Sequence, residues 1–200
     1  MTFVTELQLR DTILRSLTVQ YLGCSDALVI EELGLRHGAA RIDIAVVTGR
    51  LHGYELKSDY DTLARLPVQT PIYNSVLDLV TLVIGRYHLI EALSNIPEWW
   101  GLTLAEMQLS GQVMLSEIRR PRTNPSVDLL AVTKLLWRNE ALSILDEMGH
   151  ARGARSKPRA LIYAKLVQVA EPSWLKARVY SQLRCRTNWR SESQRVSYDD

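Results

Sequence analysis

The spacing of apolar residues changes from helical to strand-like within the first part of the chain. Residues 5–21 carry apolar side chains at helical spacing, and Thr5 can cap the N-terminus of that helix. Three short β-prone runs follow, at 27–30, 41–47 and 50–57. The N-terminal quarter therefore predicts one helix and then three strands.

The later pattern predicts further strands and then helices alone. From residue 59 the spacing becomes helical, with Asp59 or Asp61 as the cap and with Pro67 and Pro71 favouring a kink or a break. The segments that follow are a buried strand (77–85), a helix (87–94), a hairpin (102–108 and 112–118) and three helices (127–148, 157–170 and 173–183). This order predicts an α/β protein with a mixed sheet and a helical C-terminal subdomain, and the last ten residues look frayed.

The amino-acid composition fits a protein with one globular core, and the cysteines and the lack of targeting segments indicate its cellular compartment. The chain has 200 residues, of which 46% are hydrophobic and 23% charged, which excludes a disordered or collagen-like protein. The two cysteines, Cys24 and Cys185, lie far apart, so neither a disulfide framework nor a zinc site is indicated. The sequence shows neither a signal peptide nor a membrane span, and we expect a cytoplasmic protein.

Charge is distributed unevenly about the proline-containing stretch 120–125. Residues 1–120 hold 10 Lys and Arg against 14 Asp and Glu, a net charge of −4, whereas residues 121–200 hold 14 against 8, a net charge of +6. We therefore expect two parts, a core over 1–120 and a basic helical subdomain over 121–200. An acidic body beside a basic segment suggests a metal-binding carboxylate cluster and a polyanion partner, although a solvated basic surface is the alternative.

The second and third strands place two carboxylates opposite each other. If the hairpin turns at Gly49, residues whose numbers sum to 98 face one another, which pairs Asp43 with Glu55 at a Cβ separation of about 5 Å. Lys57 lies two residues beyond Glu55 and therefore on the same face. The opposite face would carry Ile42, Ile44, Tyr54 and Leu56.

Two opposed carboxylates and an ammonium group suit metal-dependent phosphodiester chemistry. Opposed like charges destabilise a sheet unless a cation offsets them, and oxygen ligands suit Mg²⁺ or Mn²⁺. Such an ion would polarise a phosphate, while Lys57 would position or deprotonate a water molecule or neutralise charge on the phosphorane. The alternative is a surface hairpin in which Lys57 forms salt bridges to both acids.

These residues resemble the PD-(D/E)XK nuclease superfamily over residues 5–95. Asp43 opens one strand and Glu55-Leu56-Lys57 lies on the next, although Ile42 stands where the superfamily name has proline. The segment 69–73 matches the QxxxY motif of RecB-like members, which implies that Gln69 and Tyr73 lie near the active site. The resemblance implies a restriction-endonuclease-like αβββαβ core. Further segments, such as 52–59 and 97–101, are similar to an uncharacterised bacterial and prophage family within that superfamily.

Further residues are expected to supply a third metal ligand and a DNA-binding surface. Glu6 on the first helix is the positional candidate for the third ligand, and Glu31 and Glu32 compete with it. Trp99 and Trp100 could stack on unpaired bases, although at least one of them should be buried. The residues expected to contact nucleic acid are Arg155, Lys157, Arg159, Arg184 and Arg186.

The sequence thus predicts a nuclease that uses Mg²⁺ or Mn²⁺ bound by Asp43 and Glu55 to hydrolyse DNA, with Lys57, Gln69 and Tyr73 in its catalytic site. We expect DNA as the partner, with branched DNA, free ends and a homodimeric assembly left open, and no membrane partner. The alternative is a non-catalytic nucleic-acid-binding or regulatory protein on a nuclease-like fold, because function belongs to the site and not to the fold.

Overall fold

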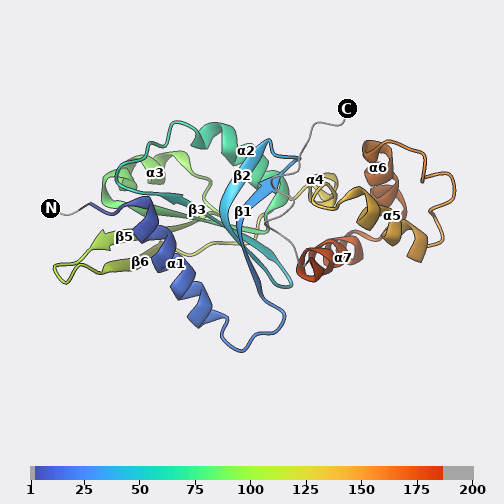
Figure 1. Cartoon of the computed structure of the whole chain (residues 1–200). Coiled ribbons are helices and arrows are strands. Elements are labelled where there is room, and N and C mark those ends of the chain that lie inside the picture. Colours follow the sequence, from blue (N-terminus) through green and yellow to red (C-terminus); the bar gives the residue numbers. More distant parts are fainter. Residues whose placement is uncertain (1–2, 187–200) are drawn as a thin grey trace.

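A six-stranded mixed sheet carries helices on both faces, and a group of four further helices lies beside one end of the sheet (Figure 1). The computed structural model describes residues 3–186. The N-terminal elements are α1 (Glu6–Gln20), β1 (Leu28–Leu35), β2 (Ala40–Val47), β3 (Leu51–Lys57), α2 (Leu66–Val76), β4 (Leu79–Gly85), the 3₁₀ turn Arg86–His88 and α3 (Leu89–Asn95). The others are β5 (Gly101–Met107), β6 (Val113–Arg119), α4 (Leu129–Thr133), α5 (Arg138–Glu147), α6 (Arg159–Val169) and α7 (Pro172–Cys185).

The strands lie in the sheet in their order along the chain. β1, β2 and β3 are antiparallel neighbours joined by short turns, whereas β4 runs parallel to β3 and β5 runs parallel to β4. Parallel neighbours require crossover connections, which α2 and α3 provide. β6 returns antiparallel to β5 as the predicted hairpin. The mixed α/β class predicted from the sequence is therefore confirmed.

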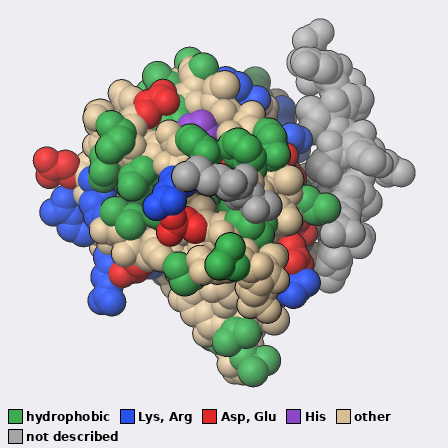
Figure 2. Space-filling model, turned by 90° about the vertical axis from the view of Figure 1, so that its left-hand side faces the viewer, with side chains coloured by type: hydrophobic (Ala, Val, Ile, Leu, Met, Phe, Trp, Pro, Cys, Tyr) green, Lys and Arg blue, Asp and Glu red, His purple; other side chains and the backbone are tan. Residues whose placement is uncertain are grey.

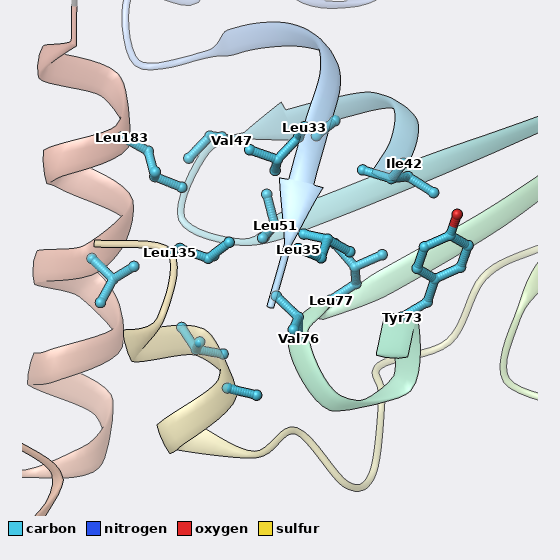
Figure 3. Close-up of a cluster of buried hydrophobic side chains, with 14 of the residues drawn as sticks. Leu33, Leu35, Ile42, Val47, Leu51, Tyr73, Val76, Leu77, Leu135 and Leu183 are labelled. Atoms are coloured by element: carbon cyan, nitrogen blue, oxygen red, sulfur yellow. The ribbon is translucent and has the colours of Figure 1, made fainter. Parts of the chain in front are cut away.

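Two hydrophobic clusters cover the two faces of the sheet. The larger cluster joins the sheet to α2 and continues into the C-terminal helices, so that Leu51 and Tyr73 belong to the same cluster as Leu135 and Leu183 (Figure 3). The smaller cluster lies under α1. Because both faces are covered, β4 consists almost entirely of buried residues, as predicted for the segment 77–85.

Buried polar contacts attach α7 to the sheet. The Asp78 carboxylate is buried and accepts hydrogen bonds from the Leu51 N–H at 2.8 Å and the Tyr180 hydroxyl at 2.6 Å. Lys176 forms an ion pair with the same carboxylate. The Arg184 guanidinium donates to the Thr48 carbonyl at 2.6 Å. The C-terminal helices therefore share polar anchors as well as apolar core with the sheet.

Neither aspartate predicted to cap the helix after β3 does so. α2 begins at Leu66 after Arg65, without a side-chain cap. Asp59 instead accepts the Val4 N–H at 2.8 Å, and Asp61 accepts the Ser58 N–H at 2.7 Å. Both carboxylates are therefore committed to the loop and to the N-terminal segment. Pro67 lies in the first turn of α2, and Pro71 is accommodated within the helix.

The long helix predicted over 127–148 is two helices, α4 and α5. The residues between them direct carbonyl groups to other helices: the Tyr163 hydroxyl donates to the Leu136 carbonyl at 2.7 Å, and Arg186 donates to the Leu135 carbonyl at 2.7 Å. Tertiary contacts thus stabilise a break that helical spacing does not reveal. The first strand is longer than predicted, and the expected fraying of the last ten residues lies outside the described part of the chain.

Among residues 3–186, no helix combines the length and the apolar character needed to cross a membrane.

Candidate active site

The carboxylates predicted from the hairpin register meet where β2 and β3 stop pairing. The register itself is confirmed, since the pairs run from Val47 with Leu51 to Ile44 with Tyr54. At the next position the Asp43 side chain takes the place of a ladder bond, because its Oδ2 accepts the Leu56 N–H at 2.7 Å. Asp43 is thereby fixed against the strand that carries Glu55 and Lys57.

The side-chain alternation of β2 reverses at Asp43. Ile42 belongs to the larger cluster, whereas Ile44 packs under α1, so the prediction that both share one face is wrong. Glu32 on β1 has a φ of 60°, and β1 pairs with β2 on either side of Glu32 and Asp43. A left-handed residue interrupts the strand geometry on which strict alternation depends. On β3 the predicted alternation holds, since Tyr54 and Leu56 belong to the smaller cluster.

Glu55 lies at the centre of a chain of hydrogen bonds from β3 to α2. Its Oε1 accepts the Lys57 ammonium at 2.6 Å, and its Oε2 lies 2.7 Å from the Tyr73 hydroxyl. That hydroxyl lies 2.9 Å from the Arg41 carbonyl and accepts an N–H of Gln69 at 3.0 Å. Helical i, i+4 spacing brings Gln69 and Tyr73 together in spite of Pro71. The structure therefore brings Glu55, Lys57, Gln69 and Tyr73 into one network.

The electrostatic environment favours a proton on two groups of the site. Burial, and then the negative charge of Glu55, raises the pKa of Asp43 to about 6. Burial and the charge of the same carboxylate also raise the pKa of Tyr73, which therefore stays a neutral hydrogen-bond donor at physiological pH. The pKa of Asp43 is thus raised first by burial and then by Glu55, and the nearby charges of Lys57 and Arg10 offset this rise only in part.

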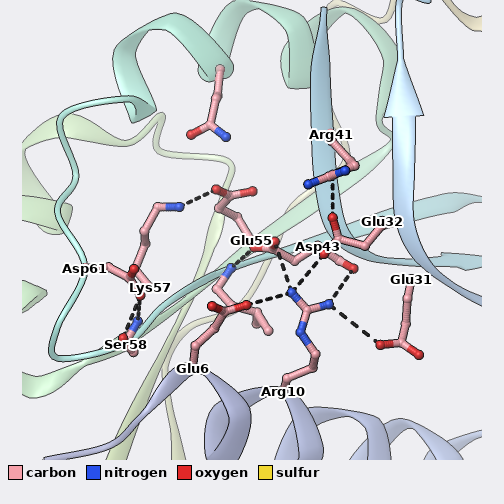
Figure 4. A network of polar contacts seen from close by, with 12 residues as sticks. Glu6, Arg10, Glu31, Glu32, Arg41, Asp43, Glu55, Lys57, Ser58 and Asp61 are labelled. Atoms are coloured by element: carbon pink, nitrogen blue, oxygen red, sulfur yellow. Dashed lines mark hydrogen bonds and ion pairs between the residues drawn. The ribbon is translucent and has the colours of Figure 1, made fainter. Parts of the chain in front are cut away.

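Arg10 of α1 lies among carboxylates from three other positions of the fold and one on its own helix (Figure 4). Its guanidinium NH2 lies 3.0 Å from Glu6, 2.9 Å from Glu32 and 3.5 Å from Asp43. Its NH1 lies 3.7 Å from Glu31. The predicted ligands Glu6, Glu32 and Asp43 thus converge, but they do so on a guanidinium group.

Sequence reasoning missed Arg10 because an arginine is not a metal ligand. A signal was present, since Arg10 follows Glu6 at i, i+4 on a helix predicted to supply an acid to the site. That spacing predicts the Glu6 pair only. The contacts with Glu32 and Asp43 require the packing of α1 against the sheet.

The carboxylates have the donor chemistry of a magnesium or manganese site but are not grouped as one. Across the described residues, no three His, Cys, Asp or Glu side chains are placed so that they could hold a metal ion. Oxygen-only donors nonetheless suit Mg²⁺ and Mn²⁺. Five carboxylates and three cations leave a formal charge of −2, which one divalent ion would balance. These groups are Glu6, Glu31, Glu32, Asp43 and Glu55 against Arg10, Arg41 and Lys57. Asp43 and Glu55, with Glu6 or Glu32, are the residues that would hold the ion.

The basic residues of the C-terminal part separate into exposed and engaged groups. Arg155, Lys157 and Arg159 are exposed in the loop before α6 and at its start, although Arg155 also lies 3.4 Å from Asp146. Arg186 has a side chain only 5% exposed and forms an ion pair with Glu140. Arg184 donates to the sheet, as described above. The structure therefore does not bring Arg184 and Arg186 into the exposed group.

Exposed aromatic rings lie next to the loop that follows Lys57. Trp100 is fully buried, as expected of one of the two adjacent tryptophans, and Trp99 is partly buried. The exposed rings are instead those of Phe3, Tyr60 and Tyr87, and the Phe3 centroid lies 5.3 Å from each tyrosine. Figure 2 shows hydrophobic side chains interspersed with charged ones on the face that includes the N-terminal end of the molecule.

Substitution of Asp43 by Asn should stabilise the protein at neutral and alkaline pH. The pKa of Asp43 rises from its ordinary 3.8 to about 6 on folding, so the ionised carboxylate disfavours the folded state above pH 6. The ionised carboxylate therefore lowers the free energy of unfolding by about 3 kcal/mol at high pH. This destabilisation disappears as the pH falls through 6 toward 4 and Asp43 takes up a proton. Urea unfolding should show that Asp43→Asn has the larger free energy of unfolding at pH 8 and nearly equal stability at pH 4.

Asp11→Asn provides the control, because it removes an exposed carboxylate from α1 that pairs with Arg15. A stability difference between Asp43→Asn and the unsubstituted protein that does not change between pH 8 and pH 4 would contradict this account of Asp43.

Comparison with known proteins relates the chain to a bacteriophage family. The family model described as Bacteriophage P4 protein cII matches residues 2–197. Protein cII of Enterobacteria phage P4 is 27% identical over 125 residues, which cover 62% of this chain and 47% of that protein. The match thus spans about half the length of that relative. Among solved structures, a protein of unknown function from Silicibacter pomeroyi, SPO1766, is similar with a TM-score of 0.42 and 16% identity, over 77% of this chain and 98% of the other. Because the family model matches almost every residue, the chain belongs to the bacteriophage P4 protein cII family.

Proposed function

We propose that this protein is a divalent-metal-dependent nuclease that hydrolyses phosphodiester bonds in DNA. The observation that carries the proposal is the convergence of Asp43, Glu55 and Lys57 at the point where β2 and β3 separate. The hydrogen bonds of Gln69 and Tyr73 to this network support it, because they fix the orientation of Glu55. Two carboxylates and an ammonium group at one point can hold a divalent ion and offset charge that develops at a phosphate.

The order of elements supports a PD-(D/E)XK assignment. One helix, three antiparallel strands, a second helix and a parallel fourth strand follow one another as α1, β1, β2, β3, α2 and β4. The site residues lie on β2, β3 and α2, where the resemblance in sequence implies them. The proposal therefore includes a restriction-endonuclease-like core over the N-terminal part of the chain.

The side chains have distinct tasks in the proposed hydrolysis. When bound, the divalent ion supplies charge neutralisation at the phosphate and lowers the pKa of water. Asp43 and Glu55 would hold it, and Tyr73 keeps Glu55 oriented through the 2.7 Å contact. In the reaction the oxygen of water bonds to phosphorus and the P–O ester bond breaks. Water loses one proton and the leaving oxygen gains one.

Lys57 supplies a cation next to the carboxylates without ligating a metal. Its ammonium is mostly buried and lies 2.6 Å from Glu55, which keeps it in place. From that position it can neutralise the charge that develops on the phosphate oxygens as water attacks. Lys57 is thus proposed as the cationic member of the site.

The exposed cations before α6 are proposed to contact the DNA backbone. Arg155, Lys157 and Arg159 present three positive charges within five residues on one exposed segment. Phosphate contacts of this kind position a nucleic acid without reading its sequence. The exposed rings of Phe3, Tyr60 and Tyr87 add a surface on which unpaired bases can stack near the site.

Neutralising this segment should reduce the salt dependence of DNA binding. For duplex DNA the slope of log K against log salt is about −0.9 per phosphate contacted. Replacing Arg155, Lys157 and Arg159 with alanine should make the slope shallower by roughly two to three. It should also raise KM more than it lowers kcat, because these contacts are the same in the ground and transition states. Fluorescence anisotropy at several salt concentrations measures the slope.

A matched variant in which Arg15, Arg120 and Arg122 are replaced with alanine also removes three exposed arginines, but from outside the segment. If the two triple variants show the same slope as the unsubstituted protein, the segment before α6 has no role in phosphate contact.

The second candidate is a non-catalytic nucleic-acid-binding or regulatory protein. The observation that favours it is the position of Arg10, whose guanidinium already offsets part of the negative charge of the site carboxylates. Such a protein would bind DNA but would not cleave it, whichever divalent metal ion is added.

Cleavage assays distinguish the two functions. Plasmid, linear duplex, single-stranded and branched DNA, with matching RNA, would be incubated with Mg²⁺, Mn²⁺ or EDTA. We expect cleavage of at least one DNA substrate with a divalent ion and none with EDTA. Binding without cleavage of every substrate would replace the nuclease proposal with the second candidate.

We also propose that the protein acts in a reducing cytosol. Both cysteines, Cys24 and Cys185, are free and exposed, which suits a compartment that keeps thiols reduced.

A further inference from the structure

Arg10 occupies the position that the expected metal ligands surround. Its NH2 is within 3.5 Å of oxygen atoms from Glu6, Glu32 and Asp43, which are three of the five acids considered as metal ligands. The guanidinium is a cation in contact with hard oxygen donors. It therefore occupies oxygen atoms of Glu32 and Asp43 that a divalent ion at this site would need (Figure 4).

We propose that Arg10 is a positioning residue that holds the metal-free site together, and that a divalent ion binds only when the guanidinium leaves Glu32 and Asp43. This inference rests on the proposed nuclease function. The two cations compete because they need the same carboxylate oxygens and repel each other at short distance in a partly buried site.

Arg10 explains how the site tolerates its own charge without a metal. Burial of the like-charged Asp43 and Glu55 near each other is unfavourable unless a cation compensates. Arg10 and Lys57 supply that compensation from opposite sides, Arg10 to Asp43 and Lys57 to Glu55. The folded protein thus keeps its carboxylates in place before an ion arrives.

The proposed movement of Arg10 would be toward its exposed helical partner. Its side chain is only 17% exposed, whereas that of its helical partner Glu6 is 60% exposed. By keeping the Glu6 pair, the guanidinium can turn outward along α1 and release Glu32 and Asp43. Glu6 therefore guides Arg10 in this scheme, while Glu32, which keeps its ion pair with Arg41 through Oε2, presents Oε1 as the third ligand.

The test is a calorimetric titration of Mn²⁺ into the full chain. Arg10→Gln removes the competing cation and changes the formal charge of the site from −2 to −3, so we expect Mn²⁺ to bind at least about tenfold more tightly than to the unsubstituted protein. Arg10→Lys keeps a positive charge, but a single ammonium group cannot bond to several carboxylates at once as the guanidinium does. The Mn²⁺ affinity of Arg10→Lys should therefore lie between that of Arg10→Gln and that of the unsubstituted protein. A purely structural role would predict weaker binding in both variants.

Thermal unfolding gives a second measurement that does not depend on activity. Without metal, Arg10→Gln should have the lower Tm, and Mn²⁺ should raise its Tm by more than it raises that of the unsubstituted protein. If Arg10→Gln is unfolded without metal, Mn²⁺ should restore folding where sodium chloride of equal ionic strength does not. Failure of Mn²⁺ to do so would overturn the proposal.

Arg15→Gln is the matched control, since Arg15 pairs with Asp11 at i, i+4 on the exposed side of the same helix. Its Mn²⁺ affinity should equal that of the unsubstituted protein. Asp43→Asn distinguishes the proposed metal site from the proposed role of Arg10. If Mn²⁺ affinity is unchanged in Arg10→Gln but Mn²⁺ binding is lost in Asp43→Asn, only the role of Arg10 is overturned. Unchanged Mn²⁺ binding in Asp43→Asn, or no binding by any of the proteins, overturns the proposed metal site itself.

Discussion

Replacing Asp43 with Asn or Glu55 with Gln should each abolish Mn²⁺ binding and reduce DNA cleavage by a factor of about 10³ or more. Both changes keep the size of the side chain and remove one negative ligand. In Glu55→Gln the amide can still accept the Tyr73 hydroxyl that lies 2.7 Å from Oε2, so the network to α2 is retained. Calorimetry for Mn²⁺ and a single-turnover cleavage assay measure the two effects.

Retention of the fold is part of this expectation. Asp43→Asn should not lose stability, because it relieves a carboxylate whose pKa burial and Glu55 raise to about 6. Glu117→Gln on β6 is the control for Glu55→Gln, since Glu117 is exposed and pairs with Arg120. If both site variants bind Mn²⁺ as tightly as the control does, Asp43 and Glu55 are not the metal ligands.

Lys57→Met should separate metal binding from turnover. An ammonium group has no lone pair with which to ligate a metal, so Lys57→Met should still bind Mn²⁺, and the loss of a cation from the site should tighten that binding rather than weaken it. Removing the cation next to the reacting phosphate should lower kcat by about 10² to 10³. Glu55 keeps its Tyr73 contact in this variant, and loss of the 2.6 Å ion pair leaves its Oε1 free for a metal.

The control for Lys57→Met is Lys165→Met, which removes a partly buried lysine on α6 outside the site. Near-normal turnover in Lys57→Met would remove Lys57 from the mechanism. A loss of Mn²⁺ binding equal to that of Glu55→Gln would show that Lys57 acts only by orienting Glu55.

Where side chains are spaced along a single element or a tight hairpin, the sequence is a sufficient guide to their placement. The register about Gly49 depends on the length of one turn, and it correctly places Asp43 next to the strand that carries Glu55 and Lys57. Helical spacing alone brings Gln69 and Tyr73 into hydrogen-bond contact. Both relations are local, so neighbouring residues along the chain are enough to define them.

Relations between distant segments required the tertiary structure. The alternation of β2 fails at Asp43, opposite the point where Glu32 on β1 takes a left-handed conformation. The helix predicted over 127–148 is divided because Tyr163 and Arg186 bond to carbonyls between α4 and α5. In each case a residue from another element lies where the local preference fails.

The sequence by itself determined the α/β class, the strand register, the residues that gather at the site and the excess of positive charge after residue 120. Only the tertiary structure decided what those charges contact. It places Arg10 among Glu6, Glu32 and Asp43, and it buries Arg186 against Glu140 while Arg155 stays exposed. The physical reason is that periodicity fixes the direction of a side chain from its own element, whereas the partner of a charge depends on how separate elements pack.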